Sequence, residues 1–405
     1  MKSFNSAKWM FLLFMLPSMV WAQKQERQIG DTTSIRTLIP ESKQGLLKNV
    51  SMIANMNYAF RNEFVDGAYT QSRFKNEQFR LEIRGQVHEK VFFRFRDRYT
   101  RAQTSESLDN LSRSVDLAHI RVDINSQWSI SAGKMCADWG AWEFDWNPID
   151  IYEYSDIVEY ADNFLSGVGF TYTPANSHNQ WTFQILDSRT KTFEELYGAQ
   201  PNFTASKAPL AFVSNWRGSL FDGKVKTIWS YSLFNEAQDI NGNSANMNYI
   251  ALGNEFNFSP KVRFIYDFKW SDEKLDRTGI VSQTIPDDIF SYAVANTLYV
   301  GHWVNLRYIV SPKVHLTFVG MLDISNWKNS FNDPENITGE QHIRNAWGFI
   351  PAVEVYPWDD LNLKFFANWV GRVYDYSDYA QTRFGAQNST TGRFTVGFIT
   401  PLGIF

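Results

Sequence analysis

The side chains best suited to chemistry in this sequence lie in one stretch, residues 135–165. It holds eight carboxylates and no Lys or Arg, interleaved with Trp and Tyr. Unlike its flanks, it shows neither strand alternation nor a clean helical stripe, and a long irregular insert within a regular domain tends to be functional. The candidate acids are Asp138, Glu143, Asp145, Asp150, Glu153 and Asp156, and the candidate aromatics are Trp139, Trp142 and Trp146.

Two chemistries suit this combination of side chains. Carboxylates around a water-filled passage determine its ion selectivity. Alternatively, indole rings stack on the apolar faces of sugars while neighbouring acids accept hydrogen bonds from sugar hydroxyls. A third interpretation makes the tryptophans anchors that pack the stretch against its surroundings.

Catalysis is not indicated. The chain lacks GxxxxGK[ST], HExxH and GxSxG motifs, and its six His residues show no metal-ligand spacing. Glu143 and Asp145, two residues apart, are weak evidence for an acid–base pair in so acidic a stretch. We therefore predict a protein that is not an enzyme and that uses no cofactor or metal.

The composition indicates the class of protein that must position these residues. Aromatic residues make up 16% of the chain, the net charge is −4, and the mean hydropathy is −0.35. The single cysteine, Cys136, rules out an intramolecular disulfide. A polar average with many aromatics is typical of an outer-membrane β-barrel, whose outward apolar residues alternate with inward polar ones.

The amino terminus predicts export. Residues 1–22 combine two lysines, a short apolar run and a Val-Trp-Ala ending, the pattern of a cleavable bacterial signal peptide. Residues 23–48 are polar and predict a periplasmic leader, and residues 49–405 predict the barrel. The apolar run is too short to span a membrane as a helix.

Period-two alternation fills most of the chain after residue 49. Seven short turns interrupt it, and long polar stretches separate the turns from one another. Two strands and one long loop fit each period, so we predict an all-β, transmembrane antiparallel barrel of about 16 strands. The short turns are centred near residues 89, 126, 176, 222, 260, 312 and 358.

Arginines gather on the polar face of three neighbouring strands. Arginine stays charged at any accessible pH, so it suits a fixed positive wall. We expect the acidic stretch to fold into the lumen as the third loop and to face this wall. The pore-lining cations predicted here are Arg80, Arg84, Arg94, Arg96, Arg98 and Arg121. Further lumen cations are predicted at Lys226, Arg263, Lys269, Lys364 and Arg393.

A family resemblance adds to this picture. The run Gly133-Lys134, the run WGAWEFDWNPID at 139–150 and the run YEYSD at 152–156 resemble the third-loop region of Bacteroidetes outer-membrane porins. Those porins belong with the phosphate-selective (O and P type) porin family. The resemblance implies a sixteen-stranded, trimeric channel with the third loop folded inward. The phosphate-selecting members place a lysine cluster at the constriction, whereas residues 135–165 contain no lysine.

The expected function is therefore passive diffusion of small hydrophilic solutes and ions, including anions such as phosphate, through an outer-membrane porin. The alternatives are a saccharide-preferring channel that uses the aromatic third loop, and a plugged structural or adhesive barrel. Expected partners are outer-membrane lipid, lipopolysaccharide, two further copies of the chain, and the barrel-assembly machinery through Phe405. No nucleic-acid partner is expected.

Overall fold

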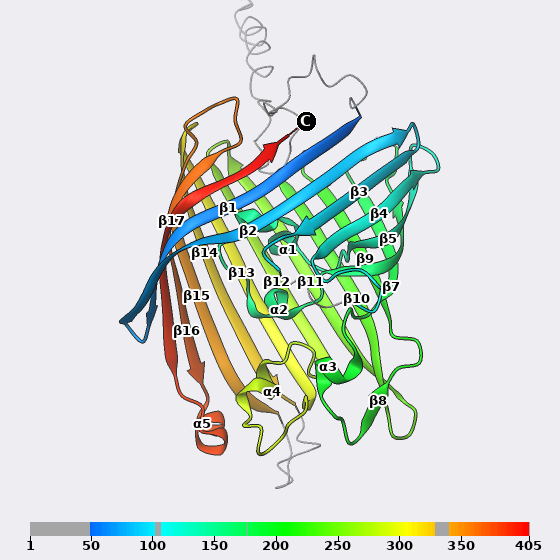
Figure 1. Ribbon diagram of the computed structural model, residues 1–405, viewed down its shortest axis with the longest axis vertical. Coiled ribbons are helices and arrows are strands. Elements are labelled where there is room, and N and C mark those ends of the chain that lie inside the picture. The colour runs from blue at the N-terminus through cyan, green and yellow to red at the C-terminus, as the bar shows by residue number, and fades with distance from the viewer. Residues whose placement is uncertain (1–48, 102–106, 176, 329–339, 405) are drawn as a thin grey trace, which may run out of the picture.

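Sixteen long antiparallel strands form the body of the protein in the computed structural model (Figure 1). The structure describes residues 49–101, 107–175, 177–328 and 340–404. The predicted signal peptide, the predicted leader and Phe405 lie outside these residues. The barrel strands are β1 Val50–Val65, β2 Ala68–His88, β3 Val91–Arg98, β4 Val115–Asp123, β5 Trp128–Cys136, β6 Phe164–Tyr172, β7 Gln180–Asp187, β9 Leu210–Leu220, β10 Val225–Asp239, β11 Ser244–Ser259, β12 Val262–Leu275, β13 Ala295–Ser311, β14 Val314–Trp327, β15 Gln341–Val355, β16 Lys364–Tyr376 and β17 Ser389–Gly403.

The sheet closes on itself, because β17 pairs with β1 from Ile53↔Gly403 to Val65↔Thr391. Each remaining strand pairs with its neighbour along the chain, and a short extra strand, β8 (Phe203–Ala205), extends the sheet beside β10. Closure satisfies every strand edge, which a sheet in a membrane requires. The predicted fold of about sixteen antiparallel strands is confirmed.

All seven predicted short turns join consecutive strands at one end of the barrel, where β17 also ends. The other end carries the long connections, with two tight exceptions. One exception is the Asp66–Gly67 turn, in which both residues adopt positive φ angles of 49° and 77°. Short turns at one end and long loops at the other match the periplasmic and extracellular ends of outer-membrane barrels.

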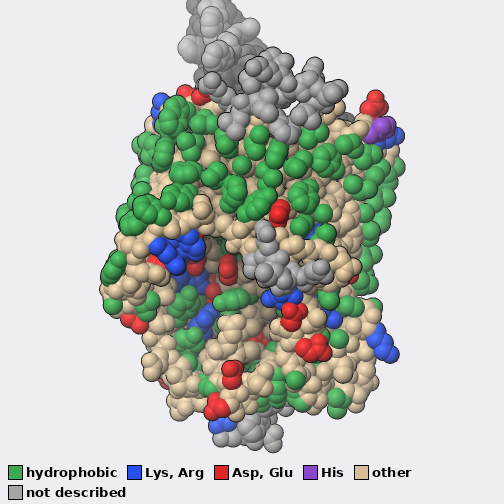
Figure 2. Space-filling model, in the orientation of Figure 1, with side chains coloured by type: hydrophobic (Ala, Val, Ile, Leu, Met, Phe, Trp, Pro, Cys, Tyr) green, Lys and Arg blue, Asp and Glu red, His purple; other side chains and the backbone are tan. Residues whose placement is uncertain are grey.

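The alternation places apolar side chains outside. On β15, Trp347 and Phe349 are exposed, whereas Ala346 and Ala352 on the opposite face are buried. Figure 2 shows hydrophobic side chains gathered over the half of the barrel nearer the C-terminus, with a more polar surface toward the long loops. No helix in the described part of the chain is long and apolar enough to cross a membrane.

Strand length varies around the barrel. The strands β3 to β7 have only eight or nine residues, whereas β10 to β17 have 13 to 17. At the tilt usual for such barrels, a strand of eight or nine residues rises roughly 20 Å, which is less than the apolar band of about 25 Å. The wall is therefore low on this side.

Short helices occupy the long connections. In residues 137–163, which we call loop L3, they are α1 (Trp142–Asp145), the 3-10 helix η3 (Pro148–Asp150) and α2 (Asp156–Tyr160). Three others, α3 (Phe193–Tyr197), α4 (Ile280–Thr284) and α5 (Asp378–Phe384), lie in later loops. Figure 1 shows α1 and α2 within the barrel and α3, α4 and α5 at its loop end.

Candidate functional site

Loop L3 lies inside the barrel and is bonded to its inner wall. The side chain of Asn57 on β1 donates to the carbonyl of Ile149 at 3.1 Å. The backbone N–H of Glu143 donates to Asp267 on β12 at 2.7 Å, and Ser230 on β10 donates to the carbonyl of Trp139. The loop is thus attached to strands on several sides of the lumen.

A glycine on β11 allows the close approach of α1 to the wall. A Cβ atom at Gly253 would lie 2.8 Å from the Cβ of Ala141 and 2.8 Å from Cδ1 of Trp142. Such distances are far below van der Waals contact, so a larger residue would push α1 inward. Gly253 therefore helps to set how far L3 narrows the lumen.

Seven of the eight acids in residues 135–165 form ion pairs with the barrel or the segments that extend it. The pairs are Asp138 and Asp145 with Arg217, Glu143 with Lys269, Asp150 with Lys364, Glu153 with Arg393, Asp156 with Arg344 and Arg372, and Asp162 with Arg277. These cations come from β9, β12, β15, β16, β17 and the segment that follows β12. The acids of L3 are thus largely neutralised by cations of the barrel and of the segments that extend it.

Glu143 is the most buried of these acids, with no exposed surface. Its carboxylate pairs with Lys269 and accepts hydrogen bonds from the backbone N–H and the hydroxyl of Ser155, at 2.6 and 2.7 Å. Removing one member of such a pair leaves a buried charge without compensation, which costs about 3–5 kcal/mol. Glu143 therefore joins α1, the start of α2 and β12 into one unit.

The ends of the loop are held in the same way. Asp162 accepts from Arg277 at 3.1 Å and from the hydroxyl of Thr190 at 3.0 Å. Burial opposes ionisation of this carboxyl, but Arg277 and Thr190 outweigh it and hold the pKa of Asp162 below its usual value. At the other end, Asp138 pairs with Arg217 at 3.7 Å, while burial raises its pKa.

Five of the acids lie across cavities from the arginines of β2, β3 and β4, as expected, but the seven paired acids do not pair with those arginines. Each of the seven paired acids contacts a cation on another strand or loop, as described above. Lys269, Lys364 and Arg393 were expected in the lumen, but Arg217, Arg277, Arg344 and Arg372 were missed. Arg372 is an even number of residues from Lys364 on the same strand, so strict alternation was a usable signal for it. Arg277 lies beyond the end of β12, where alternation gives no signal.

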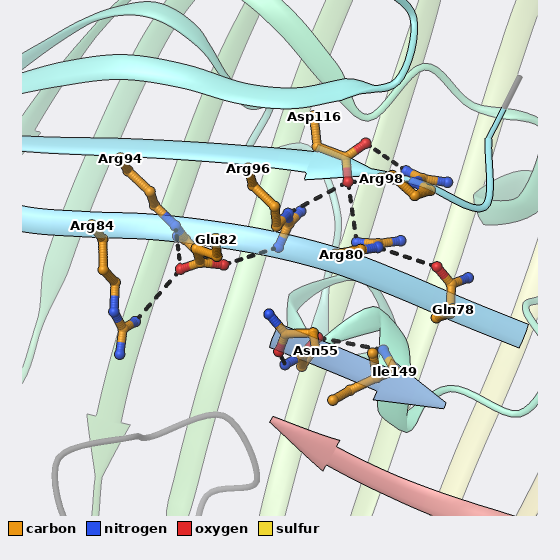
Figure 3. Close-up of polar contacts among 11 residues, drawn as sticks. Asn55, Gln78, Arg80, Glu82, Arg84, Arg94, Arg96, Arg98, Asp116 and Ile149 are labelled. Atoms are coloured by element: carbon orange, nitrogen blue, oxygen red, sulfur yellow. Dashed lines mark hydrogen bonds and ion pairs between the residues drawn. The ribbon is translucent and has the colours of Figure 1, made fainter. Parts of the chain in front are cut away.

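The five arginines of β2 and β3, which we call the arginine wall, have few carboxylates beside them. They are Arg80, Arg84, Arg94, Arg96 and Arg98. Figure 3 shows five arginines from β2 and β3 arranged around Glu82 and Asp116. Glu82 accepts two bonds from Arg94, at 3.0 and 3.2 Å, and lies 3.8 Å from both Arg84 and Arg96. Five guanidinium groups thus share two carboxylates.

Asp116 is the second of these carboxylates, and strict alternation does not place it there. Arg96 pairs with Leu117 and Asp97 with Val115, so Asp116 is the extra residue of a bulge in β4. The fully buried Asp116 accepts from Arg98 at 2.7 Å and pairs with Arg80 at 3.3 Å and Arg96 at 3.4 Å. A bulge re-aims a side chain by adding a residue to one strand, and no pattern of residue types indicated it.

Arg121 differs from the other predicted cations. Its pairing with Asp123, at 3.0 Å, is exposed, and its guanidinium lies 5.0 Å from the centre of the Phe92 ring. It lies close to the periplasmic end of the wall, away from the cluster around Asp116.

Three cavities lie one after another along the arginine wall, and each shares lining residues with the next. The outer cavity, of about 590 Å³, and the middle cavity, of about 520 Å³, are both bordered by Tyr154 and Phe164. The middle cavity and the inner one, of about 250 Å³, share Arg94 and Arg217. Together they trace a route along β2 to β4, with β1, β16 and β17 also bordering the outer cavity and β5, β6, β7 and β9 the inner one. Figure 2 shows a hollow in this face with basic side chains inside it.

Basic side chains outnumber acidic ones in every cavity along this route. The outer cavity is lined by eight Lys and Arg residues against four Asp and Glu residues. The corresponding numbers are four against three in the middle cavity and three against one in the inner cavity. The surplus is largest in the outer cavity, where a solute enters from the loop end.

Glu159 is the eighth acid of L3, and the described residues supply no ion pair for it. It lies on α2 and borders the outer cavity. The side chain of Glu159 is exposed to the lumen, but the surrounding protein reduces its hydration and raises its pKa to about 7, and the neighbouring carboxylate of Glu153 adds to the effect. Its charge therefore changes near neutral pH.

The three tryptophans predicted as a sugar surface have different surroundings. Trp139 is 2% exposed and packs against Phe144 and Tyr249, with ring centres 4.5 and 4.9 Å apart. Trp142 and Trp146 are half-buried and pack against a cluster on the β12–β16 wall that includes Trp303. The three indoles therefore do not form one continuous surface.

The closed barrel with an inward loop and a basic route beside it defines an outer-membrane diffusion channel of the porin type. The family model described as "Phosphate-selective porin O and P" matches residues 50–398. The chain therefore belongs to this family of porins, which are channels and not enzymes.

Solved structures share the fold at low sequence identity. The outer membrane channel DcaP of Acinetobacter baumannii is 11% identical, with a TM-score of 0.58 over 86% of this chain and 96% of that one. An anion-selective porin from Comamonas acidovorans is also 11% identical, with a TM-score of 0.55 over 87% and 98%. OmpF of Salmonella typhi, in complex with daunomycin, is 12% identical, with a TM-score of 0.51 over 86% and 98%. No curated protein matches the sequence.

Proposed function

We propose that this porin carries small inorganic anions, with phosphate as the leading candidate, along the route between L3 and the arginine wall. The observation that supports this most is the basic surplus in all three cavities. A passage lined by fixed charges of one sign raises the local concentration of ions of the other sign.

The acids of L3 do not oppose this proposal. Seven of them have cationic partners in the barrel or the segments that extend it, two of which, Arg217 and Arg393, also border the route, so a passing anion meets pairs with little net charge. The loop turns the uncharged Tyr154, Pro148 and Asn163 toward the route. Five of its acids also border the route, of which Asp138, Asp145, Glu153 and Asp162 are paired and Glu159 has no ion pair among the described residues. The sign of the field is then set by the arginines of β2 and β3.

Phosphate suits the geometry of this wall. Guanidinium groups bind phosphate oxygens with two parallel hydrogen bonds, and arginine keeps its charge at all relevant pH values. Arg94 and Arg98 keep 34% and 20% of their side chains exposed and share their carboxylates with other arginines, so each has further N–H groups to offer an ion. A passing phosphate would exchange water for these donors and leave again as easily, as conduction requires.

The test is the reversal potential of the purified protein in a planar bilayer under a KCl gradient. We expect anion preference in the wild type and a shift toward cations in the Arg94→Ala, Arg96→Ala double variant. The matched control removes two cations from turn segments at the periplasmic end, as Lys261→Ala with Lys313→Ala, and should leave the reversal potential unchanged. Cation preference in the wild type would overturn the proposal.

The wild-type channel also separates phosphate from other anions. If phosphate uses this route, adding it to a chloride-conducting channel lowers the current as the slower ion occupies the arginines. If millimolar phosphate does not reduce the chloride current, phosphate is not the preferred ion, although the proposal of an anion channel would still stand.

The low wall at β3 to β7 supports a trimer. An apolar band of about 25 Å exceeds the rise of these strands, so a neighbouring copy would cover the lumen on this side. The remaining proposals rest on sequence: export by a cleavable signal peptide, contact with outer-membrane lipid and lipopolysaccharide, assembly through Phe405, and a Bacteroidetes source. A plugged adhesive barrel is less well supported, because the three linked cavities follow the wall through the lumen.

A further inference from the structure

A fourth cavity lies behind L3, away from the arginine wall. Its volume is about 150 Å³, and it is enclosed by L3 and by strands β11 to β16. It borders the middle cavity, with which it shares Asp145, Trp146 and Asn147. The anion route does not need this space, and no contact described above explains it.

Five carboxylates and three basic groups line this cavity, and each carboxylate has a cationic partner. Asp145, Glu153 and Glu255 pair with Arg217, Arg393 and Lys226, which lie outside the lining. Lys364 pairs with Glu354 at 2.7 Å and with Asp150 at 3.0 Å. Arg307 lies 3.5 Å from Glu354 and donates to the hydroxyl of Tyr356 at 2.9 Å. A charged ligand would find no opposite charge in excess here, so the site suits a neutral one.

Buried polar atoms without partners lie in its wall. Trp303 is 1% exposed and Asn305 is 2% exposed. Among the described residues, neither the indole N–H of Trp303 nor the side-chain oxygen of Asn305 has a hydrogen-bond partner, and the same holds for the indole N–H of Trp142. Buried polar groups are nearly always satisfied, so a donor–acceptor set of this kind points to a ligand with hydroxyl groups.

Aromatic rings supply the rest of the site. Trp146 meets Trp303 edge to face at 5.8 Å, and the guanidinium of Arg263 lies 5.4 Å from the centre of the Trp146 ring. Indole rings present a flat apolar surface beside a polar N–H, which matches the C–H face and the hydroxyls of a sugar. An engineered protein cavity of about 150 Å³ holds benzene, so this volume suits a solute with a single six-membered ring.

We propose that this cavity binds a neutral, polyhydroxylated solute of monosaccharide size. Trp142 and Trp146 contact its apolar face, and Trp303 and Asn305 exchange hydrogen bonds with its hydroxyls. The site is separate from the anion route and does not depend on it. Because it borders the middle cavity, a solute reaches it from the lumen.

The test is isothermal titration calorimetry of the purified full-length protein with D-glucose as the probe. We expect weak binding, in the millimolar range. Trp146→Ala and Trp303→Phe should each weaken it by about tenfold, which is about 1.4 kcal/mol. The control Trp139→Phe changes a buried indole of L3 outside the cavity and should leave binding unchanged. Because Trp303 packs in the wall, its variant is first checked for the strand content of the wild type by circular dichroism, and the half-buried Trp146 provides an independent reading.

Two further measurements separate this site from the anion route. The Arg94→Ala, Arg96→Ala protein should bind D-glucose as the wild type does, and inorganic phosphate should not displace the sugar. Absence of D-glucose binding to the wild type would overturn the proposal, as would an unchanged affinity in both tryptophan variants. Displacement by phosphate would also overturn it, because the sugar would then lie on the route.

Discussion

The two sides of loop L3 meet the barrel in opposite ways. Toward β9 to β17, its carboxylates are joined to cations of the wall, and a cavity of about 150 Å³ lies between L3 and β11 to β16. In front of it, toward β2 to β4, five arginines share Glu82 and Asp116 and border three linked cavities. The same loop therefore closes one half of the lumen and leaves a basic passage in the other.

This difference shows that the charge of a constriction is not the charge of the residues in it. Residues 135–165 are strongly acidic, yet the route beside them is lined mainly by basic groups. A paired carboxylate exerts little field beyond its partner, whereas arginines that outnumber their acids retain a net charge. The sign seen by an ion depends on which charges are left without a partner.

The largest effect is expected from removing an ion pair that holds L3 to the barrel wall on the closed side. Glu143→Gln leaves Lys269 buried without its counter-ion, which costs about 3–5 kcal/mol. We expect L3 to detach from β12, so that single-channel conductance rises and fluctuates. Planar-bilayer recording measures both changes.

The matched control for this variant is Glu195→Gln, which removes an exposed acid paired with Arg113 in another loop. Exposed pairs contribute little, so its conductance should remain that of the wild type. A steady, unaltered conductance in Glu143→Gln would show that this pair does not hold the loop.

A smaller effect is expected from removing a carboxylate from the arginine wall, on the open side of the loop. Asp116→Asn removes one of two carboxylates from the arginine wall and should increase anion preference. A unit charge about 8 Å from an ion in a water-like dielectric changes its energy by about 0.5 kcal/mol, or about twofold in permeability ratio. The reversal potential in a salt gradient measures this ratio.

Glu354→Gln is the comparison for Asp116→Asn. Asp116 pairs with Arg80, Arg96 and Arg98, which border the route, whereas Glu354 borders the side cavity and its partners Lys364 and Arg307 border none of the three route cavities. It removes the same charge and should leave the reversal potential where it was. Equal shifts in the two variants would contradict the assignment of the route to the arginine side.

The smallest effect is expected from pH. Reduced hydration inside the lumen raises the pKa of Glu159 to about 7, so this carboxyl is charged above that pH and becomes neutral as the pH falls through it. Losing a negative charge in the outer cavity raises the basic surplus. Anion preference should therefore increase by up to about twofold on acidification from pH 8 to pH 6.

The charged groups nearest Glu159 include Glu153, Asp156, Glu143 and Arg98, and the first three have cationic partners. In Glu159→Gln the reversal potential should be independent of pH over this interval. If the reversal potential of that variant still changed with pH as much as that of the wild type, the titrating group would be another residue.

Much of the architecture followed from local chemistry. A strand between lipid and water must alternate, and its turns must be polar, so period-two patterning located the seven periplasmic turns. The same alternation placed Arg80, Arg94 and Arg96 on the polar face of their strands. Residues 135–165 stood out because they broke the pattern on both sides of them.

The pairing of charges followed from the tertiary structure alone. Residue types in L3 indicate eight acids, but not that Glu143 lies against Lys269, 126 residues further along the chain. The bulge that turns Asp116 inward has no signature in residue types either. The sequence by itself determined the barrel, its turns and the loop within it, because alternation is a local consequence of having lipid on one face. Only the closed barrel decided which charges cancel, because cancellation depends on distances between strands that are remote in the chain.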